Sequence, residues 1–231
     1  MSNLIIGIKM EELKRDARIL AYVNCLLPVV FLSIGILSLG SFVSNNLLEG
    51  LKNHVVFMSL IELVMFPFYF YFWFKFLGSL KRNYEGNANI MPAVIIAKTV
   101  LVLKILFMFI GLIASMVIFS KHSFTNLNVQ TGYWGLYPDG TTGYIFTSIR
   151  LIVIILAAIM YFLLSESTES KSSMRYIALA LAVITIVSGS ANLQSEAWGW
   201  NILQYVGFVL EFVFLYRISQ GYEFIGNKKE E

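Results

Sequence analysis

The sequence predicts an all-α fold, a polytopic membrane bundle of about six transmembrane helices. Three observations support this: the 231 residues are 58% hydrophobic, only 13% are charged, and the apolar residues come in long unbroken runs. A soluble domain has roughly a quarter of its residues charged, because its surface must be hydrated. A bilayer accepts long apolar runs because lipid solvates them, and about 20 apolar residues cross its hydrocarbon core.

Six segments are long enough to cross the membrane, and together they predict a transmembrane domain over residues 19–218. The predicted spans cover residues 19–43, 54–78, 92–119, 144–164, 174–193 and 198–218. The fifth span is short and ends in small residues such as Ser188 and Gly189. Small residues at this position favour either a close helix contact or an end that unwinds beside a cavity.

Polar segments flank the predicted transmembrane domain on both sides. Residues 1–18 form a leader in which Leu13 and Ala17 continue a helical apolar spacing among charged residues. This pattern suits a helix lying on the inner membrane surface, and it equally suits a cytoplasmic extension of the first span. Residues 219–231 form a second polar segment, which is expected to be a cytoplasmic tail.

The positions of lysine and arginine predict the orientation, because these residues concentrate in cytoplasmic loops. With the N-terminus inside, the outer loops contain only Lys52 and Lys121. The cytoplasmic side then contains Lys9, Lys14, Arg15, Arg18, Lys75, Lys81, Arg82, Lys171, Arg175, Arg217, Lys228 and Lys229. The sequence therefore predicts that both termini are cytoplasmic in an integral protein of the plasma (cytoplasmic) membrane, with the lipid bilayer as a partner.

Charged residues inside the predicted spans are the candidate site residues. A charge at the bilayer centre costs at least ~2.5–3.5 kcal/mol on insertion scales, so such residues normally face the bundle and find partners. At 1.5 Å per residue, Lys104 lies roughly 18 Å from the inner end of its span and Glu211 roughly 20 Å from the outer end of its own. Depths of this kind predict two pairs, Lys104 with Glu211 and Arg150 with Glu62, acting as a relay or as structural contacts. Lys98 is close enough to the inner end to extend to the surface or to line a path.

Aromatic residues gather on the predicted outer side. Their amphipathic rings favour the membrane interface, so we expect them to anchor this side, with a lid over the bundle as the alternative. The residues are Tyr133, Trp134 and Tyr137 in the long loop, and Trp198 and Trp200 at the start of the sixth span.

The sequence contains no recognisable catalytic or cofactor motif. His54 and His122 have no neighbours at metal-ligand spacing, and there is no phosphate-binding glycine loop or nucleophile motif. No dense basic face points to nucleic acid. We therefore expect no metal, no cofactor and no nucleic-acid partner, and the absence of motifs disfavours an enzyme.

Two functions fit these predictions about equally. The first is a small transporter or channel-like protein that uses its intramembrane charges. The second is a non-catalytic subunit that assembles with a membrane-protein partner or a second copy, with its aromatic second span facing that partner. An enzyme acting on lipid within the membrane is a third alternative, but the sequence lacks the nucleophile or metal site that it needs.

Overall fold

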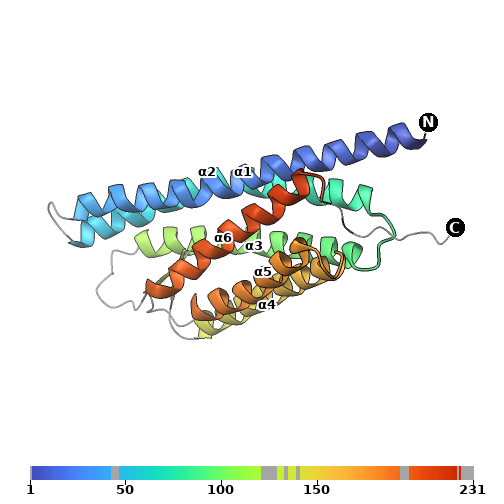
Figure 1. Cartoon of the computed structure of the whole chain (residues 1–231). Helices are drawn as coiled ribbons and strands as arrows, with labels where there is room; N and C mark the ends of the chain where they lie inside the picture. Colours follow the sequence, from blue (N-terminus) through green and yellow to red (C-terminus); the bar gives the residue numbers. More distant parts are fainter. Residues whose placement is uncertain are drawn as a thin grey trace.

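In a computed structural model, the described part of the chain forms six α-helices and one short β-hairpin (Figure 1). The elements are α1 (Ser2–Phe42), α2 (Leu47–Asn83), α3 (Ile90–Ser120), β1 (Val129–Gly132), β2 (Gly135–Pro138), α4 (Thr141–Glu166), α5 (Ser173–Asn192) and α6 (Trp198–Ser219). The structure describes residues 2–42, 47–120, 129–132, 135–138, 141–192, 198–222 and 224.

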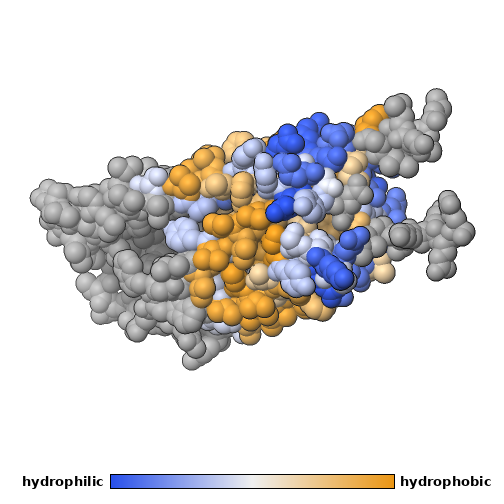
Figure 2. Space-filling view, viewed as in Figure 1, coloured by the Kyte–Doolittle hydropathy of each residue, from blue (hydrophilic) through white to orange (hydrophobic). Residues whose placement is uncertain are grey.

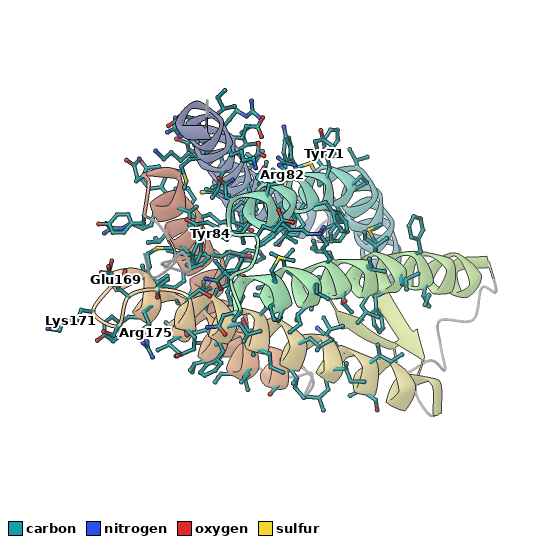
Figure 3. The ribbon with its side chains drawn as sticks, turned by 90° about the vertical axis from the view of Figure 1, so that its right-hand side faces the viewer. Tyr71, Arg82, Tyr84, Glu169, Lys171 and Arg175 are labelled. Atoms are coloured by element: carbon teal, nitrogen blue, oxygen red, sulfur yellow. The ribbon has the colours of Figure 1, made fainter. Side chains whose placement is uncertain are left out.

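The helices form a closed ring in the order of the sequence. Each helix packs against the one before it and the one after it, and α6 packs against α1. Figure 3 looks along the ring from one end and shows the helices following one another around it. A ring of this kind has an interior, and side chains from helices that are not sequence neighbours meet there.

One end of the ring carries the start of α1, the α2–α3 turn, the α4–α5 turn and the end of α6; we call it the tail end (Figure 1). Hydrophilic residues gather at the tail end, and an apolar belt adjoins them (Figure 2). The turns there have clear caps. Asn87 Oδ1 accepts a hydrogen bond from the Ile90 amide at 2.9 Å, and Ser172 Oγ accepts one from the Met174 amide at 3.2 Å.

Within the described residues, three helices are long and apolar enough to cross a membrane: Ile90–Ile110, Thr147–Glu166 and Ser173–Ser190. The all-helical prediction is thus confirmed for the bundle, but the three spans are fewer than the six predicted. Parts of α1, α2 and α6 have side chains that lie outside the described residues. The three helices identify a membrane protein whose apolar surface suits contact with a lipid bilayer.

The leader and the first predicted span form one continuous helix, because α1 runs for 41 residues from Ser2 to Phe42. The leader is therefore an extension of that helix rather than a separate surface helix. Its apolar residues Leu13 and Ala17 are buried in the core, at 1% and 0% exposure. The charged residues of the leader lie at the tail end, where Figure 2 shows the hydrophilic surface.

The end of the fifth predicted span is helical, since α5 continues to Asn192. Its small residues allow a close approach to α4. A Cβ atom added to Gly189 would lie 2.6 Å from Ile154 Cδ1, well inside van der Waals contact. Glycine therefore allows α4 and α5 to approach more closely here than a larger residue would.

The aromatic residues of α2 pack mainly inside the ring. Phe66, Tyr69, Phe70, Trp73 and Phe76 are all buried, and neighbouring rings meet in edge-to-face contacts such as Trp73 with Phe76 at 5.9 Å. Phe68 and Tyr71, by contrast, are 60% exposed. The aromatic richness of the second span is therefore largely explained by the core of this chain.

The hairpin of β1 and β2 was not predicted. The two strands are antiparallel, with Gln130 opposite Tyr137, and β2 lies beside α3 and α4. Hairpin pairing of such short strands depends on the chain around them more than on local apolar pattern. Tyr133 and Trp134 lie outside the described residues, as do the side chains of Tyr137, Trp198 and Trp200, so the anchor or lid remains a prediction.

Candidate functional site

A carboxylate inside the ring, that of Glu211, is held by side chains from two other helices. Glu211 is on α6 and is only 9% exposed. Its Oε1 accepts a hydrogen bond from the Tyr161 hydroxyl on α4 at 2.7 Å, and its Oε2 accepts one from Asn24 Nδ2 on α1 at 3.0 Å. The contact joins α1, α4 and α6 within the apolar bundle.

Lys104 on α3 is a further partner of Glu211, but it lies farther from the carboxylate than Asn24 and Tyr161 do. It interacts electrostatically with Glu211, but among the described residues no direct ion pair joins the two. At 1.5 Å per residue, Lys104 is about 21 Å along α3 from its tail-end start, whereas Glu211 is about 12 Å from the end of α6. The difference in depth explains why the amine acts on the carboxylate without touching it.

We call Asn24, Lys104, Tyr161 and Glu211 the interior cluster. Each belongs to a different helix whose other residues are mostly apolar, so the helices rotate their polar groups inward, where hydrogen-bond partners exist. Four of the six helices thus contribute to one polar centre.

Asn24 has hydrogen-bonding capacity that the protein does not use. Its side chain is 0% exposed, and its Oδ1 has no hydrogen-bond partner within the described part of the protein. Buried polar atoms are normally paired. The amide oxygen is therefore available to a donor that enters beside the carboxylate, such as a proton-bearing water molecule.

The partners of Glu211 leave its carboxylate chemically able to exchange a proton. Both hydrogen bonds to Glu211 come from neutral donors, and each carboxylate oxygen keeps a further lone pair. The only cation of the cluster, Lys104, acts from a distance. Such a carboxylate can take up and release a proton without breaking an ion pair, which is how acidic side chains serve in membrane proton relays.

A second buried carboxylate, that of Asp16, lies at the tail end and is 2% exposed. Ser79 donates a hydrogen bond to its Oδ2 at 2.6 Å, and Arg15 and Lys75 approach its Oδ1 at 3.4 and 3.6 Å. Arg82 donates in turn to the Ser79 hydroxyl at 3.0 Å. This group, the Asp16 clamp, joins α1 to α2 and has its negative charge matched by neighbouring cations.

The described residues do not include both side chains of the second predicted pair, Arg150 and Glu62. Arg150 is half-buried on α4, and Glu62 is in α2 with a side chain outside the described residues. The two helices are not neighbours in the ring. Lys98 is partly exposed on α3. The roles of Glu62, Arg150 and Lys98 remain predictions.

Sequence reasoning missed Asn24, Tyr161 and Asp16. Asn24 had a usable signal, because it lies about 8 Å from the inner end of the first predicted span, close to the roughly 10 Å of Glu211 in the sixth. Tyr161 had none, since it is one of many aromatic residues in apolar runs. Asp16 had no separate signal, because it is one of several charged residues in the leader.

No protein-family model matches this sequence, and no curated protein or solved structure shows detectable similarity to it.

Proposed function

We propose that this protein is a small membrane transport protein that moves protons through the interior of its helix ring, with Glu211 as the exchanging carboxylate. The observation that carries this proposal is the environment of Glu211. It is buried in an apolar bundle, and among the described residues its hydrogen bonds come from the neutral donors Asn24 and Tyr161 alone. A buried carboxylate with a purely structural role is normally paired directly with a cation, as Asp16 is.

The proposal includes six membrane crossings with both termini in the cytoplasm of the plasma membrane. Support comes from the up-and-down order of the helices and from the basic residues that collect at the tail end, among them Arg82, Arg175 and Arg217. Positive residues favour the cytoplasmic side. The tail end is accordingly assigned to the cytoplasm.

Proton flux through the purified full-length protein tests the proposal. Liposomes containing a pH-sensitive dye are given a pH gradient, with potassium and valinomycin to balance charge. The wild type should dissipate the gradient faster than protein-free liposomes, and Glu211→Gln should reduce the rate to that background. Glu85→Gln is the matched control, because Glu85 is an exposed carboxylate in the α2–α3 turn.

Three results would overturn the proposal. Equal flux in the wild type and in Glu211→Gln would remove Glu211 from the pathway. Wild-type flux no faster than that of protein-free liposomes would exclude the proton as the transported species. A loss of flux in Glu85→Gln as large as that in Glu211→Gln would show a general effect of charge rather than a role for the interior cluster.

Assembly with another membrane protein is less well supported than transport. The aromatic second span was its main support, and the structure buries most of those rings within this chain. Purification from native membranes in a mild detergent separates the alternatives, because a stable stoichiometric partner would favour the subunit function.

A further inference from the structure

The chain turns sharply at the end of α6, at Gly221. Gly221 has a φ of +92°, a conformation that glycine adopts at little cost. The Gly221 amide donates to the Ile218 carbonyl at 3.0 Å, and the Tyr222 amide donates to the Arg217 carbonyl at 3.2 Å. These two bonds form a Schellman motif, which ends a helix and fixes the direction of the next residues.

Beyond this turn, Phe224 is buried at the tail end of the ring and is only 3% exposed. Its ring meets Tyr84 edge-on at 5.5 Å, and its amide donates a hydrogen bond to the Tyr84 hydroxyl at 3.2 Å. Tyr84 follows the end of α2 and is 8% exposed. In the end-on view of Figure 3, Tyr84 lies inward of the charged residues Glu169 and Lys171 at the rim.

A series of aromatic contacts connects Phe224 to the interior cluster. Phe224 packs against Phe214 on α6 at 6.4 Å, and Phe214 packs edge-on against Tyr161 at 6.3 Å. The Tyr161 hydroxyl binds Glu211. The rings therefore occupy the space between the tail end and the carboxylate.

We propose that Phe224 and Tyr84 form a plug that closes the tail-end route to Glu211, and that withdrawal of Phe224 opens this route to water. The proposal rests on the proposed function, because it assigns a gate to the same site. Phe224 suits this role because it lies beyond the end of α6, whereas the turn that ends α6 is held by hydrogen bonds of its own. Arg217 binds the neighbouring Tyr222 through a 2.8 Å hydrogen bond and a cation–π contact at 5.0 Å.

The test measures water access with a cysteine reporter, so it does not depend on transport. The background is full-length protein with Cys25→Ser, which removes the single native cysteine. Ala97→Cys is the reporter, since Ala97 is 2% exposed on α3 and shares a helix face with Lys104 seven residues further on. A charged, membrane-impermeant thiol reagent is applied to permeabilised membranes, so that the reagent reaches both sides of the bilayer.

Phe224→Ala should raise the labelling rate of the Ala97→Cys reporter about tenfold or more, because loss of a large buried ring favours the open local state. Tyr84→Phe, which keeps the ring but loses the hydroxyl acceptor, should raise it by a smaller factor. Tyr222→Ala is the matched control, since Tyr222 is a 42% exposed ring on the same turn, and should leave the rate unchanged.

An unchanged rate in Phe224→Ala would overturn the plug, and so would an equal increase in Tyr222→Ala. A second reporter, Ala21→Cys, reports unfolding, because Ala21 is 0% exposed on α1. If Phe224→Ala also exposes that reporter, Tyr84→Phe decides the matter, and unchanged labelling in that variant refutes the plug. Increased labelling together with normal flux in Glu211→Gln would retain the plug and reject the proposed function.

Discussion

The molecule contains two buried carboxylates with opposite surroundings. Asp16 is 2% exposed at the tail end, where Arg15 and Lys75 face its oxygen and match its charge. Glu211 is 9% exposed in the interior, where Asn24 and Tyr161 supply only neutral donors. The comparison shows that burial alone does not determine how the charge of a carboxylate is compensated. The charge and distance of its partners do.

The largest expected difference in stability is between Asp16→Asn and Glu211→Gln. Asp16→Asn places an amide, which has its own N–H groups, among three hydrogen-bond donors. In Glu211→Gln the new N–H group can find an acceptor, because the Asn24 amide can rotate and present its unused Oδ1. Asp16→Asn should lower the free energy of unfolding by about 2 kcal/mol and Glu211→Gln by less than about 1 kcal/mol. Thermal unfolding in a mild detergent, followed by circular dichroism, measures both. The reverse order would contradict the comparison.

A smaller effect is expected from Tyr161→Phe, which removes a single donor from the interior cluster. The lost hydroxyl lies 2.7 Å from Glu211, so the variant should lose about 1.5 kcal/mol of stability and should also transport protons more slowly. Tyr22→Phe is the control, because Tyr22 is 57% exposed on α1, and should change neither property. Unaltered flux in Tyr161→Phe would show that the hydroxyl only positions the helices.

The smallest effects are expected from the two lysines, compared through double-mutant cycles. Lys75 is 36% exposed, so its coupling to Asp16 should be about 0.5 kcal/mol. Lys104 is half-buried on an apolar helix, and its coupling to Glu211 should be about 1 kcal/mol. Lys104→Met should therefore be less stable alone than together with Glu211→Gln, since the single change leaves a buried charge without compensation. Additive effects in the interior pair would remove Lys104 from the cluster.

Much of the helical architecture could be predicted from the sequence, because apolar runs of this length have few other stable solutions. Charged residues in those runs were equally visible, which is why Lys104 and Glu211 could be singled out. Their relative depth was less predictable. The sequence estimate counted Lys104 from the inner end of its span and Glu211 from the outer end of its own. Counted from the tail end, Glu211 lies about 12 Å along α6 and Lys104 about 21 Å along α3.

The uncharged members of the site were harder to find. Asn24 and Tyr161 are ordinary residues until their helices are placed around Glu211, and only the closed ring places them there. Phe224 is a similar case, because a single aromatic residue in a polar tail has no periodicity to mark it as buried. Contacts between distant parts of the chain decide such positions, and local pattern does not report them.

The order of the ring has a consequence for biosynthesis. Because each helix packs on its predecessor, each newly made helix finds its sequence neighbour already present. The contact between α1 and α6, which we call the seam, is the exception, because α6 is synthesised last. Asn24 and Glu211 meet across this seam, so the hydrogen bond between them can form only after α6 has been synthesised.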